Sequence, residues 1–363
     1  MQKLRAYSDS VLLGRPRVWP VVAIVFCWTV VFNAWACSVP VFRYALDRWP
    51  AENYELRVDR AAAATPEMTT LLGALRTNSL ANVTIQTLAI AGPATAKLVF
   101  PDPPGGEVWA GPLSAANLEL ALDSPVRREI ARRIVHGESA VWVLVESGDA
   151  AADDKVASAL ERRLKQWVSA AALPEQDPND PTSQIGPGPA LALRFSVLRL
   201  SRKDPREAVT LAMLEANSDE IRRLRTVPIA FPVFGRGRVL AAVPKENLTD
   251  ESIDEVCAFI VGACSCQVKD SRTGWDLLLS FNWDEELARV EEQRQSAAVA
   301  ASPGAPANPP AAQSALKPET VTIRGGSAAG APGAMNGRAW LAVALVLACM
   351  GGIAAVGWSR RKR

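Results

Sequence analysis

The sequence predicts an α/β domain held between two membrane-spanning helices. Runs of strand-forming apolar residues, such as AVWVLVES at 140–147, alternate with segments whose apolar residues recur every three or four positions, which is the pattern of an α/β fold. Apolar segments at 19–38 and 339–358 bracket this region, and each is long enough for a bilayer core about 30 Å thick. A folded middle region with a tether at each end is therefore expected.

The first apolar segment, Trp19–Cys37, follows a basic leader over residues 1–18 and has three interpretations. It can remain as an uncleaved transmembrane anchor, or it can be a secretory signal whose Ala34-Trp35-Ala36 forms a cleavage site. Cys37, directly after it, resembles the lipidated cysteine of bacterial lipoproteins and is the candidate lipidation residue, although Trp35 is bulky where that signal prefers a small residue. The length of the segment does not separate the three.

Basic residues flank both spans on their outer sides, at 1–18 and at 359–363. Because Lys and Arg stay on the cytoplasmic side, we expect a cell-membrane protein with an extracytoplasmic main domain, and with both termini in the cytoplasm if the first span is uncleaved. The 40 basic and 38 acidic residues give a net charge of +2, and the terminal clusters hold part of the positive charge. Nucleic acid is therefore not an expected partner; the membrane and a cell-envelope protein are.

Between Ser124 and Cys266 the predicted elements follow a regular order. Ser124 is a helix cap and Pro125 a first-turn residue of an amphipathic helix. The next elements are a buried strand at 140–147, a helix capped by Asp153 or Asp154, a buried strand at 191–200, helices around 205–217 and 218–225, strands at 227–234 and 238–243 joined by Gly235-Arg236-Gly237, and a helix from about Thr249.

This order, with parallel crossovers first and a hairpin at the end, resembles the thioredoxin-like fold. Pro228 stands at the head of the first hairpin strand, where that family places a cis proline, and a cis bond is affordable only before proline. Pro232 departs from the pattern, because its missing donor would break a strand ladder unless a bulge or an edge accommodates it. The family's redox Cys-x-x-Cys is also missing, since 148–154 reads GDAAADD, so the usual disulfide chemistry is not expected there.

Residues 54–122 repeat a similar order and form a predicted N-terminal α/β unit ahead of the second domain at 123–290. Its elements are strands at 54–58 and 82–90 around a helix at 66–78, a hairpin from 94–100 and 106–112 that follows Pro93, and a helix at 113–122. The unit is either a tandem copy of the thioredoxin-like arrangement or an extension of a single sheet.

Cys264 and Cys266 are the candidate redox or metal residues. Two thiols this close can chelate a soft ion such as Cu(I), and Lys269 can lower a thiol pKa. The simpler interpretation is a disulfide, or two partly buried thiols. Cys257 falls on the apolar stripe of its helix and is expected in the core.

Other catalytic groups are scarce. The one histidine, His136, ends a basic helix, where a positive ring favours the helix C-terminus. Four acidic residues cluster after the buried strand, at the end of a sheet where α/β ligand sites gather: Glu146, Asp149, Asp153 and Asp154. Helix capping explains the last three more simply. Arg236 and Arg238 are expected on a solvated turn, while Trp275 and Trp283 are expected to pack a terminal element onto the domain. No catalytic residue is predicted, and no cofactor apart from the candidate Cu(I).

The Ala-, Pro- and Gly-rich stretch at 293–338 is predicted to be a disordered linker spanning roughly 35–40 Å as a flexible coil. With the resemblance and the topology, the sequence predicts a non-catalytic, thioredoxin-like, membrane-anchored binding or assembly module of a bacterial cell envelope. The competing hypothesis is a thiol-disulfide or copper-handling protein that uses Cys264 and Cys266.

Overall fold

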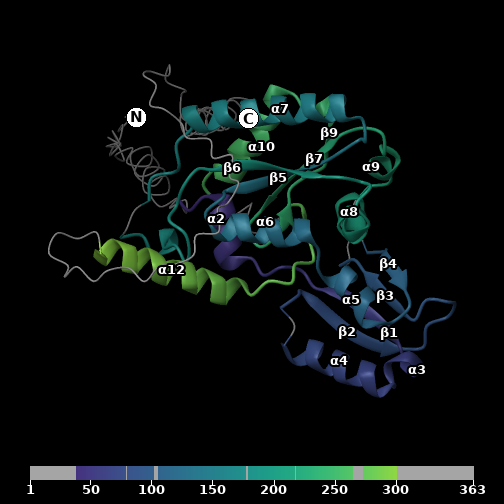
Figure 1. Ribbon diagram of the computed structural model, residues 1–363. Helices are drawn as coiled ribbons and strands as arrows, with labels where there is room; N and C mark the ends of the chain where they lie inside the picture. Colours follow the sequence, from purple (N-terminus) through teal and green to yellow (C-terminus); the bar gives the residue numbers. More distant parts are fainter. Residues whose placement is uncertain are drawn as a thin grey trace, which may run out of the picture.

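The computed structural model describes residues 38–78, 80–101, 105–176, 179–216, 218–264 and 273–300 (Figure 1). Within these ranges no helix combines the length and the apolarity that crossing a bilayer requires. The predicted spans at 19–38 and 339–358 lie outside the described residues except for Ser38, as do the two basic ends, Cys37 and Cys266.

The chain has a mixed α/β fold with two sheets. The first sheet has the order β2 (Val83–Leu88), β1 (Tyr54–Asp59), β3 (Ala96–Val99) and β4 (Glu107–Gly111). The second has the order β10 (Trp275–Asp276), β8 (Arg238–Val239), β7 (Ile229–Phe234), β5 (Ala140–Val145) and β6 (Phe195–Leu200), with β9 (Val243–Pro244) also paired to β7. The strands of residues 54–122 therefore do not extend the second sheet.

The strands of both sheets pair in the same pattern. In the first, β1 runs parallel to β2 on one side and antiparallel to β3 on the other, and β3 is antiparallel to β4. In the second, β5 is parallel to β6 and antiparallel to β7, and β7 is antiparallel to β8. A helix joins the two parallel strands in each case: α4 (Pro66–Asn78) in the first sheet and α7 (Ala150–Ala170) in the second.

Helices cover both faces of the second sheet (Figure 1). Strand β5 is buried along its whole length, as its continuous apolar sequence predicts. Trp142 and Leu144 point into a cluster with side chains of α7, α10 (Asp250–Val261) and α2 (Val41–Arg48). Val141 and Val143 point to the opposite face, where α6 (Pro125–Val135) and α8 (Ala208–Glu215) pack; α9 (Asp219–Arg223) follows α8.

The caps of these helices agree with the sequence in part. Ser124 caps α6 by accepting a hydrogen bond from the Arg127 amide, with Pro125 at the first helical position. Thr249 caps α10 in a capping box with Ser252. For α7 the prediction was wrong, because Asp149 is the cap, and the helix begins at Ala150.

Pro232 is accommodated by an interruption in the strand that faces it. The predicted strand at 238–243 is divided into β8 and β9, and β7 pairs with β8 through Val233 and with β9 through Ala230. The carbonyl of Pro232 lies between these pairs and accepts a hydrogen bond from the Leu240 amide at 3.0 Å. Because Pro232 has no amide to donate, a regular ladder on both sides of β7 is impossible at this position.

Helix α2 was not predicted from the sequence. It precedes both sheets in the chain but packs on the second, against α10 and β7. The Val41 amide donates to the Gly262 carbonyl and the Cys264 amide to the Val39 carbonyl, both at 2.9 Å. The first-sheet unit is therefore inserted, in sequence, between α2 and the rest of the second unit.

The first sheet has one apolar and one polar face. Tyr54, Leu56 and Val58 of β1 are fully buried, in a cluster that includes side chains of α4 and α5 (Ala115–Leu122). The alternate residues Glu55 and Arg57 are partly exposed and form an ion pair with each other. The short helix α3 (Arg60–Ala63) follows β1 directly, capped by Asp59.

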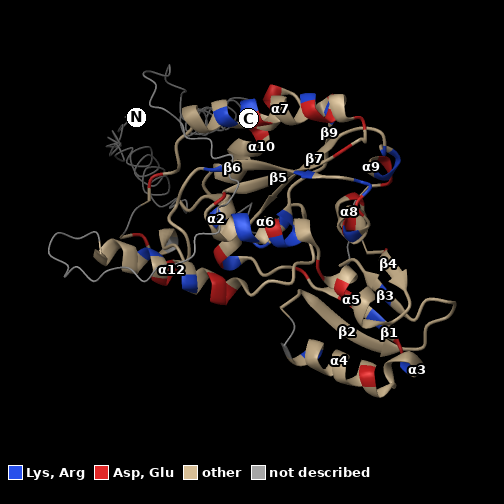
Figure 2. Cartoon of the chain, viewed as in Figure 1, with Lys and Arg blue, Asp and Glu red and all other residues tan. Residues whose placement is uncertain are grey.

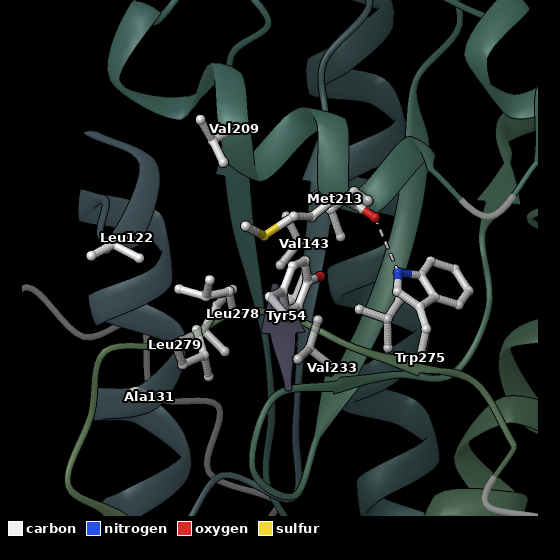
Figure 3. Packing of buried hydrophobic residues seen from close by; sticks show 14 of the residues in the cluster. Tyr54, Leu122, Ala131, Val143, Val209, Met213, Val233, Trp275, Leu278 and Leu279 are labelled. Atoms are coloured by element: carbon white, nitrogen blue, oxygen red, sulfur yellow. Dashed lines mark hydrogen bonds between the residues drawn. The ribbon is translucent and has the colours of Figure 1, made fainter. Parts of the chain in front are cut away.

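Residues 275–281, here called the connecting segment, join the two sheets (Figure 3). The Trp275 indole donates to the Met213 carbonyl at 3.2 Å, and the Leu277 amide donates to the Gly237 carbonyl at 2.9 Å, both on the second unit. On the first unit, the Leu279 amide donates to Asn82 Oδ1 at 2.8 Å. Leu277, Leu278 and Leu279 are buried in the cluster shared by both units.

Two buried arginines support this segment. Arg127 is 1% exposed and donates to the carbonyls of Leu120 and Ala121 at 3.2 Å and of Leu278 at 3.1 Å. Burial lowers the pKa of Arg127 to about 10. Arg238 pairs with buried Asp276 at 2.9 Å, so the prediction that Arg238 lies on a solvated turn was wrong.

The last described helix, α12 (Trp283–Ala300), is attached to the body by Trp283 and Leu287 and carries charged residues along the rest of its surface (Figure 2). It continues to Ala300, so the predicted disordered linker does not begin at Gln293. Gln, Arg and Ala have high helix propensities, and Glu291 pairs with Arg294 one turn on at 2.6 Å. Trp275 and Trp283 are both buried, as predicted.

Replacing Arg127 by Met should lower the free energy of unfolding by about 3 kcal/mol, because three buried carbonyls lose their donor. Chemical denaturation of the full chain would measure the change. Arg128→Met is the matched control: that side chain is 61% exposed, and its loss should change stability by less than about 0.5 kcal/mol. Equal effects of the two substitutions would contradict the role given to Arg127.

Candidate functional site

The candidate site is the loop at the carboxyl end of β5, residues 146–149, with the first turn of α7. The resemblance places a redox cysteine pair here, and polar residues occupy the position instead. Gly148 has a φ of 95°, which lets the chain turn sharply from the strand toward the helix. Asp149 then caps α7 by accepting from the amides of Ala151 at 3.0 Å and Ala152 at 3.2 Å.

Asp153 closes this loop from the first turn of the helix. It is 1% exposed, and its Oδ1 accepts hydrogen bonds from the Ser147 amide and from the Ser147 hydroxyl, both at 2.8 Å. Its Oδ2 accepts from the Gly148 amide at 3.1 Å. Burial acts to raise the pKa of Asp153, but these hydrogen bonds and the charge of Arg199 outweigh it and hold the pKa below its usual value.

The other acidic residues of the cluster lie outside the loop and are paired. Arg199 of β6 contacts Glu146 at 2.7 Å and Asp154 at 2.6 Å. The predicted cluster of Glu146, Asp149, Asp153 and Asp154 is thus brought together at one end of the sheet. Each carboxylate accepts hydrogen bonds: Asp149 from amides of the first turn of α7, Asp153 from the loop, and the other two from Arg199. The cluster therefore stabilises the strand-to-helix connection.

Pro228 lies at the same end of the sheet. It is buried and directly precedes β7. Since Val145 pairs with Ile229, the next position along places Pro228 opposite Glu146 at the edge of the loop. The Pro228 carbonyl accepts a hydrogen bond at 3.0 Å from the amide of Lys245, which fixes the end of β9 beside it. The cis isomer of this proline stays a prediction.

The candidate thiol site lies elsewhere. Cys264 is fully buried, with 0% exposure, in the cluster formed by α2, α7 and α10, and Cys257 is buried in the same cluster. Burial raises the pKa of the Cys257 thiol and so disfavours the thiolate. Cys266 lies outside the described residues, so the structure does not show how the two candidate thiols are arranged.

Metal ligands do not gather in the described ranges, where no group of three or more His, Cys, Asp and Glu side chains is placed to hold an ion. His136 is the C-cap of α6, and its Nδ1 lies 2.7 Å from the Arg132 carbonyl. The helix-terminal position predicted for His136 is confirmed.

A small hollow, with room for about one water molecule, lies at the opposite end of β5, between α2, α6 and residues 189–191. Its lining is largely apolar, with Phe42, Leu46 and Ile134 on one side. Glu138 Oε2 is buried there without a hydrogen-bond partner among the described residues, and burial raises the pKa of Glu138. The described lining contains no second carboxylate, so it supplies no acid–base pair.

Two residues that matter for the arrangement were not identified from the sequence. Asn82 bonds the connecting segment in both directions, and Arg127 holds carbonyls from two separate segments. Their partners in the connecting segment lie at least 151 positions away in the chain, although Asn82 also bonds Glu52 and Arg127 also bonds Ala121. The one local signal was an arginine on the apolar stripe of α6, between Ile130 and the cap Ser124.

Comparison of the chain with protein-family models, with curated proteins and with solved structures gives no match.

Asp153→Asn should lower the free energy of unfolding by about 2 kcal/mol at neutral pH, since an amide NH₂ would face the Gly148 amide. The pKa of Asp153 is lowered on folding, so its contribution is complete above its ordinary value of 3.8 and is lost as the pH falls through the lower folded value. The difference between the two proteins should therefore shrink in urea unfolding below pH 3.8.

The matched control is Asp154→Asn. This neighbouring side chain is 64% exposed and pairs with Arg199 at the surface, so its replacement should change stability by less than about 0.5 kcal/mol. If Asp153→Asn behaves like Asp154→Asn at neutral pH, Asp153 does not close the loop in the way described.

Proposed function

We propose that this protein is a non-catalytic, membrane-anchored binding or assembly module on the extracytoplasmic side of a bacterial cell envelope. The single observation that carries the proposal is the closed loop after β5. Asp153 binds Ser147 and Gly148 there, at the position where the resemblance would place a redox cysteine pair. The folded region then acts as a rigid body that presents surfaces rather than a reaction centre. Its partner is an envelope protein, and its tethers are the two predicted spans.

A thioredoxin-like assignment is part of the proposal. The order from α6 to α10 is helix, strand, helix, strand, helices, hairpin, helix, and it has the parallel crossover and terminal hairpin on which the resemblance rests. The first sheet repeats the same strand connections. This repetition supports a tandem pair of units, the first of which has no helix between its second and third strands.

The bonds of the loop support a non-catalytic role. Redox catalysis needs an accessible thiolate, and none of the residues between Ser147 and Asp154 carries sulfur. Ser147 is the only hydroxyl of the loop, and it donates to an ionised carboxylate rather than to a neutral base. A serine nucleophile needs a base that can accept its proton, and an aspartate of lowered pKa is a poor one.

The tethers fit the observed ends of the folded region. Helix α2 begins at Val41, within a few residues of the first apolar segment, and its entry is bonded to the end of α10. The proposed membrane attachment therefore acts directly on the second unit. At the other end, α12 ends at Ala300, and residues 301–338 separate it in the sequence from the second apolar segment.

The competing thiol or copper function is the weaker one. A Cu(I) ligand must reach the ion as a thiolate, and Cys264 is fully buried in an apolar cluster. Using it would require opening the contact between α2 and the end of α10.

Titration of the purified, reduced full chain with Cu(I) should show no stoichiometric complex, and the chain should not reduce a model protein disulfide. The physical reason is that its one described candidate thiol is in the core. A one-to-one copper complex that disappears in Cys266→Ala would contradict the proposal and establish the competing function. Ala36→Ser, outside the pair, serves as the unaffected control.

Reporter insertions test the proposed compartment. Alkaline phosphatase inserted after Ala300 should be active in cells, because that enzyme folds only outside the cytoplasm, and the same enzyme fused after Arg363 should be inactive. A fluorescent protein that needs the cytoplasm should show the reverse pattern. Activity at Arg363 with none at Ala300 would contradict the topology.

A further inference from the structure

Strand β2 is an open edge of the first sheet. Among the described residues its strand partner is β1 alone, so the outer side of β2 is unpaired. Thr84, Gln86 and Thr87 are exposed. From Ala81 to Gly92 the sequence contains no charged residue and no proline, and Figure 2 shows β2 without charge. An uncharged, unbroken edge of β-branched residues is a template for a further strand.

Two other outer strands, β6 and β4, are protected. Arg133 of α6 reaches around the edge of β6, where its Nη1 donates to the Val197 carbonyl at 3.1 Å and to the Ser196 hydroxyl at 3.0 Å. Helix α8 lies against β4 at the far side of the first sheet. Edges are commonly blocked by charged side chains or by a covering helix. On β2, Arg76 of α4 donates to the Thr87 hydroxyl at 2.9 Å, near the end of the strand, but in the part of the chain that the structure describes no charged side chain bonds the backbone of Val83–Leu88.

The C-terminal part of the chain already pairs with the start of this edge. Ser280 forms an antiparallel bridge with Ala81, and the Phe281 amide donates to the Leu80 carbonyl at 3.1 Å. The chain then turns into α12 and leaves the edge. Pairing of the C-terminal region with β2 is therefore begun at Ala81 and left incomplete from Val83 onward.

We propose that Thr320–Arg324, beyond the described residues, adds as a strand to the outer edge of β2. This stretch reads TVTIR and closely matches VTIQ at the start of β2. It holds the only β-branched residues between 301 and 338, where the remaining sequence is dominated by Ala, Pro, Gly and Ser. Strand addition supplies main-chain hydrogen bonds, while alternate side chains face the two sides of the sheet.

The reach of the chain suits this pairing. Helix α12, with 18 residues, is about 27 Å long, so a segment that returns to β2 must cover a comparable distance. A flexible chain the length of residues 301–319 has a root-mean-square span of about 25 Å. A tether whose span matches the distance gives an effective concentration in the millimolar range, which favours the chain's own segment over one from another molecule.

The proposed pairing is inferred from the β2 edge and the sequence at 320–324, and does not rely on the proposed membrane attachment. Its consequence rests on the proposed membrane attachment: it would hold Arg324 at the body and leave residues 325–338 as the tether to the second span.

Hydrogen exchange of the detergent-solubilised full chain tests the inference. Val321→Pro removes a backbone donor from the segment without touching any residue of the folded body. The outward-facing amides of β2 should exchange about tenfold or more faster in Val321→Pro than in the wild-type chain, because their partner is lost. Ile323→Pro should reproduce the effect, and Ala311→Pro, in the same linker, is the matched control and should not.

Equal β2 exchange rates in the wild-type and Val321→Pro chains would overturn the inference. Protection that survives Val321→Pro and grows with protein concentration would also overturn it, since a second copy would then occupy the edge. A failed reporter topology leaves these exchange rates unchanged, so failure of the proposed membrane attachment is distinguishable from failure of the pairing.

Discussion

The architecture depends on the bonding of one stretch of backbone, the connecting segment at 275–281. It passes between two sheets, where water cannot satisfy its amides and carbonyls, so protein groups must do so. Gly237 accepts from it on one side and Asn82 binds it on the other, while Arg127 takes the Leu278 carbonyl. Tyr54 adds its hydroxyl to the Asp276 carbonyl at 2.9 Å. Without these partners the segment would leave several buried polar groups unpaired, each costing about 1–3 kcal/mol.

That junction joins the two units through one shared buried cluster. Apolar side chains of β1 and of β5 belong to the same buried cluster, and the leucines of the connecting segment fill the space between them (Figure 3). Helix α2 adds a second link, since the start of the chain is bonded to the end of α10. The N-terminal unit is thus closed in by earlier and later parts of the chain, and a force on either proposed tether is first carried by the second unit.

Local sequence predicted the elements well and their long-range partners poorly. The apolar run at 140–145 and the cap Ser124 carry their information within a few residues, so both were identified. Helix α2 follows an apolar segment that dominates its surroundings, and its amphipathic pattern is too short to stand out. Arg238 was placed on a turn because its neighbours are glycines, whereas its burial depends on Asp276, a partner 38 positions away. At the candidate site, three closely spaced aspartates are equivalent in sequence, and only the position of the Ser147 donors distinguishes Asp153 from the cap Asp149.

Polar groups that already have partners within the fold bind a ligand less readily than polar groups that face solvent. At the carboxyl end of β5, the lone pairs of Asp153 are taken by the loop itself, and Arg199 neutralises the carboxylates around it, so a ligand arriving there would have to displace internal bonds. On the outer side of β2 the backbone groups face solvent, and a strand that pairs with them exchanges water for main-chain partners without breaking anything in the fold. The net free-energy gain per hydrogen bond is small at either surface, but only binding at the β2 edge avoids breaking a bond within the fold. Binding at the β2 edge is therefore the less costly of the two, because it leaves the internal bonds of the loop after β5 intact.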